Sequence, residues 1–152
     1  MNQTVFDPDP VAARQNWMSI LARASAAAIE AALTKDRPLP TWTRVRGPET
    51  GLIMVRGRAG GSGAPFNLGE MTVTRCTVLL TSGAAGHAYV AGRDERQAEL
   101  AAVADALLQE DEDLRDAVIA PLAEAQLESR QTRAEKAAAT RVEFFSMRNM
   151  RS

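Results

Sequence analysis

A change of periodicity along the chain constrains its fold more than any other feature. Residues 41–92 carry the glycines, the turn signals and the β-branched residues, whereas the flanking segments repeat apolar residues about every 3.6 positions, as helices do. The connections predicted within 41–92 are short, and short connections favour antiparallel pairing because parallel strands need long crossovers. The pattern therefore predicts an α+β fold with an antiparallel sheet packed by helices.

Four strands in a meander are predicted in the central region. Their approximate ranges are 42–46, 51–58, 70–80 and 85–91. The segment Gly47-Pro48-Glu49-Thr50 is interpreted as a turn between the first two strands, and Ser82-Gly83 as the turn between the last two. A glycine-rich loop at 59–65 joins the second strand to the third.

Helices are predicted on both sides of the sheet region in the sequence. Their ranges are 10–24, about 26–35, 94–109, a short helix near 113–119, and a long helix from Pro121 to about 139. The helix at 94–109 has the clearest signal, because Asp94 and Gln97 form a capping-box pattern ahead of an apolar stripe that should cover the sheet. The acidic run 110–113 is interpreted as a solvated connection.

The chain is predicted to form one domain, because its 152 residues suffice for a single core. Its parts are an N-terminal helical part (10–35), the sheet (41–92), helices (94–139) and a C-terminal tail (140–152). Between Leu127 and Val142 the last helix offers only alanines as apolar residues, so its own domain should hold it weakly. The tail residues predicted to dock on a partner are Arg141, Phe144, Phe145 and Met147.

Several functional classes are excluded by what the sequence lacks. There is no apolar run of about 20 residues, as a membrane span requires, and the first ten residues do not resemble a secretory signal. The net charge of −1 argues against nucleic-acid binding. The single cysteine, Cys76, cannot form an internal disulfide. These features predict a cytoplasmic protein.

No catalytic or metal-binding constellation is apparent. The sequence has no phosphate-binding loop motif, dinucleotide fingerprint or nucleophile elbow. His87 is the only histidine and is interpreted as a partly exposed sheet residue, while Cys76 is interpreted as a small core residue. We therefore predict no catalytic residue, no metal site and no cofactor bound by this chain.

An anion site is the chemistry that the residues do allow. Arg56 and Arg58 lie two positions apart on one predicted strand and so share a face. A glycine loop follows at once, and such loops let backbone N–H groups approach phosphate oxygens. The candidate residues are Arg56, Arg58, Gly60, Gly61, Gly63 and Arg75. The alternative is a plain hairpin loop whose arginines pair with acids or with a partner protein.

The order of several short stretches resembles a known family. They are RQNWMSILA at 14–22, ETGL at 49–52, the arginine and glycine candidates above, PFNLGE at 65–70, TVTR at 72–75, GRD at 92–94, DAL at 105–107, IAPL at 119–122 and RVEFFSM at 141–147. Together they resemble PhnG, the G subunit of the bacterial carbon–phosphorus lyase system for phosphonates. The resemblance covers about residues 14–148.

The resemblance implies a subunit of a larger enzyme. In that system MgATP and an alkylphosphonate give α-D-ribose 1-alkylphosphonate 5-triphosphate with release of adenine. The I subunit is regarded as the nucleosidase-like component, supported by G, H and L, and G, H, I and J form a core complex. The implied partners of this chain are therefore the I subunit most directly, and also H, J and L, with the isolated chain inactive.

Two further readings stay open at this point. The chain either only supports the I subunit, as a scaffold without ligand contact, or it also lends Arg56, Arg58 and Arg75 to the binding of triphosphate or phosphonate. The alternative from a different class of function is a self-sufficient phosphate-ester enzyme that uses the glycine loop.

Overall fold

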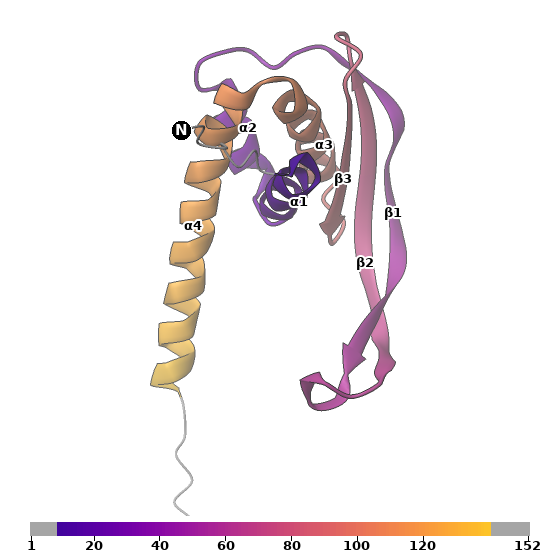
Figure 1. Ribbon diagram of the computed structural model, residues 1–152, viewed down its shortest axis with the longest axis vertical. Helices are drawn as coiled ribbons and strands as arrows, with labels where there is room; N and C mark the ends of the chain where they lie inside the picture. The colour runs from indigo at the N-terminus through magenta and orange to yellow at the C-terminus, as the bar shows by residue number, and fades with distance from the viewer. Residues whose placement is uncertain (1–8, 141–152) are drawn as a thin grey trace, which may run out of the picture.

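A three-stranded antiparallel sheet forms one layer of the molecule, and the helices lie on one side of it (Figure 1). The computed structural model describes residues 9–140. The elements are α1 (Pro10–Leu21), α2 (Ala26–Thr34), β1 (Trp42–Arg58), a 3-10 turn (Ala59–Gly61), β2 (Pro65–Leu80), β3 (Ala85–Ala91), α3 (Glu95–Glu110) and α4 (Glu112–Ala139). The strand order is β1-β2-β3, so the α+β class and the meander are confirmed. None of the described helices is long and apolar enough to cross a membrane.

The prediction of four strands is wrong, because the first two are a single strand. β1 runs through the predicted turn with irregular register between Arg44 and Glu49, and Glu49 again lies opposite Arg75 of β2. Gly47 has a φ of 69°, which a glycine adopts freely, so the chain makes the irregular step here without reversing direction. The local signal was that of a turn, but pairing with β2 on both sides of it makes it a bulge.

The two helices predicted around Pro121 are also one helix. Pro121 lies inside α4, where it lacks the N–H that would bond to the preceding turn. Val118 and Leu122 are both buried on the core side of α4, just before and just after the proline. Packing of these two side chains holds the halves in line, and this outweighs the local cost of the proline.

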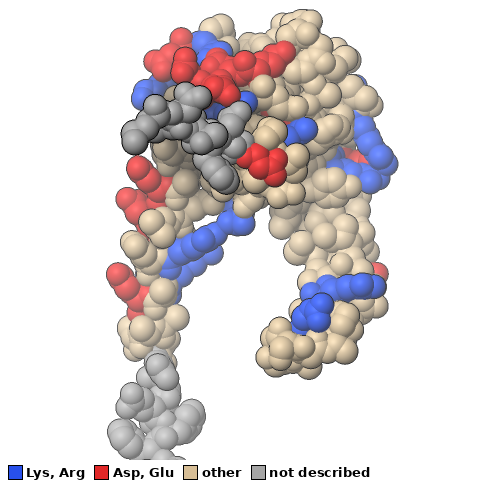
Figure 2. All heavy atoms as spheres, viewed as in Figure 1, with Lys and Arg blue, Asp and Glu red and all other residues tan. Residues whose placement is uncertain are grey.

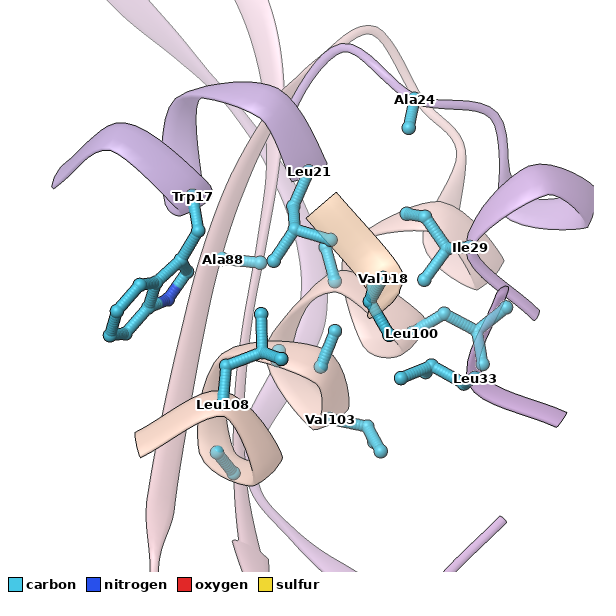
Figure 3. Close-up of a cluster of buried hydrophobic side chains, with 14 of the residues drawn as sticks. Trp17, Leu21, Ala24, Ile29, Leu33, Ala88, Leu100, Val103, Leu108 and Val118 are labelled. Atoms are coloured by element: carbon cyan, nitrogen blue, oxygen red, sulfur yellow. The ribbon is translucent and has the colours of Figure 1, made fainter. Parts of the chain in front are cut away.

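The core lies between α3 and the sheet, with α1, α2 and the first half of α4 closing the other side (Figure 3). α3 begins as predicted, because the Asp94 side chain accepts a hydrogen bond of 2.9 Å from the backbone N–H of Gln97. It approaches β3 so closely that a Cβ at Gly86 would collide with the backbone of Ala102. Cys76 is buried in this core, as predicted, with 2% of its surface exposed.

A buried carboxylate, Asp105 of α3, ties three elements together. It accepts hydrogen bonds from Arg14 Nη2 at 2.7 Å, from Trp17 Nε1 at 2.9 Å and from the backbone N–H of His87 at 3.0 Å. The bond to His87 satisfies an N–H group on the strand edge that β2 does not cover. Asp105 thus fixes α1 and β3 relative to α3.

A second carboxylate, Glu99, joins α3 to β1. Arg44 donates to it through Nε and Nη2 at 2.7 and 2.8 Å, and Trp42 Nε1 donates at 2.9 Å. The hydrogen bonds from Arg44 lower the pKa of Glu99, and the bond from Trp42 adds to this, against the opposing effect of burial.

The Glu99 contact predicts a pH dependence of stability. Because the folded-state pKa of Glu99 is lowered, its contribution exists above the unfolded pKa of about 4.3 and is lost as the pH falls through the folded pKa. We expect Glu99→Gln to be less stable than the wild type near neutral pH and to show a shallower loss on acidification. Urea unfolding from neutral pH down to about pH 3.5 measures this, with the exposed Glu124→Gln as control. Parallel curves for Glu99→Gln and wild type would contradict the assignment.

Two projections extend from the body on the same side (Figure 1). β3 pairs only with residues 73–79 of β2, whereas β1 and β2 continue together to the pair Arg58–Pro65. We call residues 52–72 the arm. Residues 127–139 of α4 are exposed throughout, and we call them the overhang. This exposure agrees with the predicted weak attachment of the last helix to its own domain.

Candidate functional site

The predicted anion-binding loop forms the tip of the arm. Arg56 and Arg58 are exposed at the end of β1, and Gly60 and Gly61 have φ values of 60° and 81° in the turn that follows. The backbone N–H of Gly63 donates to Ala59 O at 2.9 Å. Arg58 Nη1 donates to Gly63 O at 3.1 Å. The N–H of Gly63 and one N–H of Arg58 are therefore already engaged in hydrogen bonds within the loop.

Arg75 lies far from this tip. It faces Glu49 across the β1–β2 ladder, whereas Arg56 faces Asn67, and eight residues of extended strand span about 26 Å. Arg75 Nε donates to Glu49 Oε1 at 2.6 Å, and Arg46 Nε donates to the same oxygen at 2.5 Å. The bond from Arg46 is the largest cause of a lowered pKa of Glu49, and the bond from Arg75 lowers that pKa further. The six candidates therefore do not meet in one site.

The surroundings of His87 agree with its interpretation as a partly exposed residue of the sheet. Its side chain is exposed on β3, and its Nδ1 lies 3.1 Å from Thr77 Oγ1 of the neighbouring strand. Burial raises the pKa of the Cys76 thiol, which disfavours the nucleophilic thiolate. Among residues 9–140, no group of three or more metal-ligating side chains comes together.

A cleft of about 600 Å³ lies between α1, β3 and the start of α4, and it is a weaker candidate for anion binding than the tip of the arm. Its two arginines are already engaged. Arg14 is paired with Asp105, while Arg115 donates to Leu108 O at 2.6 Å and stacks 5.0 Å from the ring centre of Trp17. The remaining lining is mostly apolar, so the cleft offers little attraction for an anion.

The arm exposes more apolar surface than a free hairpin would be expected to carry. Phe66 is 46% exposed and Leu68 is 66% exposed. The other exposed apolar residues of the arm are Leu52, Ile53, Met54 and Met71. Contiguous exposed apolar residues of this kind typically mark a protein–protein interface. The tail residues Arg141, Phe144, Phe145 and Met147 lie outside the described residues, and their partner-docking role stays a prediction.

Comparison with known proteins decides the family. The chain matches the family described as "Phosphonate metabolism protein PhnG" over residues 12–149. The chain belongs to the PhnG family. It is also 46% identical, over 147 residues, to the α-D-ribose 1-methylphosphonate 5-triphosphate synthase subunit PhnG of Rhizobium meliloti (strain 1021), covering 93% of this chain and 92% of that relative. The resemblance inferred from the sequence stretches is thus confirmed.

The PhnG match includes both projections as well as the core. Residues 12–149 contain the whole arm, the whole overhang and most of the tail. The family therefore includes the arm and the overhang and not only the sheet-and-helix body. Whether Arg56 and Arg58 bind an anion stays a prediction.

Proposed function

We propose that this chain is a non-catalytic subunit of an α-D-ribose 1-methylphosphonate 5-triphosphate synthase. The observation that carries the proposal is the 46% identity to a subunit of that name over 93% of the chain. The arm and overhang support it, because they expose apolar and cationic side chains that a free-standing protein does not need. The proposed partners are the other subunits of the carbon–phosphorus lyase system, the I subunit most directly.

In the proposed reaction the assembly replaces adenine on the ribose of ATP by an alkylphosphonate. The bond between ribose C1 and the adenine nitrogen breaks, and a phosphonate oxygen forms the new bond to C1. Adenine leaves with the electron pair of the broken bond and takes up a proton. The sequence carries none of the usual catalytic motifs, and on this ground we assign the chemistry to a partner and the support of its shape to this chain.

The proposal predicts that activity depends on assembly. The purified chain incubated with MgATP and methylphosphonate should release no adenine above background, whereas the same chain mixed with the other subunits of the synthase should release it steadily. Chromatographic measurement of adenine tests both halves. The matched control is the mixture of partner subunits without this chain, which should be slower. Robust adenine release by the single chain would favour the self-sufficient enzyme instead.

A further inference from the structure

Charge is sorted onto two faces of the overhang. Gln126 marks the face of α4 that is turned toward the body, because its Nε2 donates to Ile20 O of α1 at 2.8 Å. At about 100° per residue, Arg130 and Arg133 lie within about 40° of Gln126 around the helix. Glu124, Glu128 and Glu135 lie more than about 150° away from it. The arginines therefore continue the inward face of α4, and the acids occupy the outward face.

Figure 2 shows the same arrangement in space. Basic side chains line the side of α4 that faces the arm, acidic side chains lie on the outer side, and the space between the projections is open. Further basic side chains lie toward the end of the arm. We call the open space between arm and overhang the fork. Arg56 and Arg58 belong to its arm wall, because they alternate with Thr50, whose Oγ1 lies 3.0 Å from Oγ1 of the buried Thr74 on the helix side of the sheet. Arg130 and Arg133, on the inward face of α4, belong to its helix wall.

These four arginines differ from most arginines of the described chain, since Arg23 and Arg93 are the only others among residues 9–140 without an ion pair. Among residues 9–140, the ion pairs engage Arg14, Arg37, Arg44, Arg46, Arg75, Arg96 and Arg115. No fork arginine takes part in any of them, and Glu70, the single carboxylate of the arm, is not paired with them either. Four guanidinium groups without a carboxylate partner, on two facing walls, favour an anionic occupant.

The dimensions of the walls favour a polypeptide over a single phosphate compound. The overhang is about 20 Å long at 1.5 Å per residue, and the arm strand from Leu52 to Arg58 is about 23 Å long. The arm wall also exposes apolar side chains, because Leu52 and Met54 alternate with Arg56 and Arg58 on one face of β1 and are 63% and 53% exposed. An occupant that uses all of this surface is long, acidic and partly apolar.

We propose that the fork clasps an acidic segment of a partner subunit of the synthase. Its carboxylates pair with Arg56 and Arg58 on one side and with Arg130 and Arg133 on the other, since guanidinium groups bind carboxylates in two-point geometry. Its apolar side chains pack against the arm. This inference rests on the proposed function, because it names how the subunit holds its partner.

Zero-length cross-linking tests whether one segment touches both walls. In Arg56→Lys and Arg130→Lys variants, carbodiimide treatment of the assembled complex joins the new amine to a carboxylate in contact with it. We expect both variants to link to the same acidic peptide of the same subunit, identified by mass spectrometry. Glu128→Lys, on the outward face of α4, is the control and should not link to that peptide. Links from the two walls to unrelated peptides, or no links at all, would overturn the proposal.

Affinity measurements test the same contact without a cross-linking reagent. We expect Arg56→Ala/Arg58→Ala and Arg130→Ala/Arg133→Ala each to weaken binding to the partner subunits by about tenfold or more, with less salt dependence than the wild type. The combined variant should lose less than the product of the two effects, because both walls hold one segment. The control Glu128→Ala/Glu135→Ala should bind within about twofold of the wild type.

The alternatives give different results in these experiments. Normal assembly of the arginine variants with a raised KM for ATP or methylphosphonate would overturn the clasp and show that the arginines serve the small substrates. If the affinity losses caused by the substitutions on the two walls multiply fully, the clasp would also be overturned, because the two walls would then make independent contacts. Failure of the wild-type chain to bind any synthase subunit would instead reject the proposed function itself.

Discussion

Asp105→Ala is expected to lower the free energy of unfolding by about 3–5 kcal/mol, the range seen when one partner of a buried ion pair is removed. The side chain of Asp105 is fully buried and accepts hydrogen bonds from α1 and from the backbone of β3. Its loss leaves the Trp17 indole N–H and the His87 backbone N–H without this acceptor. Since a domain of this size has a total stability of about 5–15 kcal/mol, the variant should be close to unfolding.

Arg14 moderates this loss, because its side chain is 34% exposed and water can solvate the freed guanidinium group. Asp105→Asn, which keeps an oxygen acceptor, should therefore lose less stability than Asp105→Ala and remain measurable by urea unfolding. The matched control is Asp116→Ala on the exposed side of α4, which should change stability by no more than about 0.5 kcal/mol. An Asp105→Ala loss as small as that of Asp116→Ala would refute the role of Asp105 as the tie between α1, α3 and β3.

The sequence predicted those features whose signals are local. The start of α3 follows from Asp94 capping Gln97, and the burial of Cys76 follows from its place on an alternating strand. The shared face of Arg56 and Arg58 follows from the two-residue repeat of a strand. In each case the residues that set the structure are a few positions apart, so no knowledge of the rest of the fold was needed.

The features that the sequence did not predict depend on distant partners. Gly47-Pro48 carries a turn signal, but the pairing of Glu49 with Arg75 keeps β1 in the sheet. The same ladder places Arg75 far from Arg56, and its register cannot be read from spacing. Likewise Pro121 does not end α4, because Val118 and Leu122 pack in the same core.

Two features that were not predicted, a buried structural carboxylate and a basic face of α4, did have a signal in the sequence. Asp105 occupies the apolar stripe of α3, four positions after buried Ala101, and a charged residue on such a stripe requires buried partners. Arg130 follows Leu122 and Gln126 at four-residue steps, so it continues one face of α4. The contact of Gln126 with α1 shows that this face turns toward the body, and Figure 2 shows basic side chains on the side of α4 that faces the arm.

Shortening the arm is expected to abolish assembly while leaving the body folded. Residues 54–70 are deleted, and Ile53 and Met71, which are paired across the ladder, are joined by an Asn-Gly turn, the sequence preferred in two-residue hairpins. No residue of 54–70 belongs to the buried core, in which the first residue of β2 is Val73. The shortened chain should therefore keep its helical circular dichroism and stay within about 1 kcal/mol of wild-type stability.

Assembly should be lost because the deletion removes the exposed apolar and cationic groups together. Met54, Phe66 and Leu68 are each worth about 1.5–3 kcal/mol if a partner buries them fully. Loss of two such contacts corresponds to about a hundredfold or more in affinity at 1.4 kcal/mol per factor of ten. Co-purification and adenine release with the other subunits measure this. The intact arm with Phe66→Ala and Leu68→Ala is the companion variant, which keeps Arg56 and Arg58 and should show a partial loss. Wild-type assembly of the shortened chain would move the interface to the helices, and an unfolded shortened chain would mean that the arm supports the body.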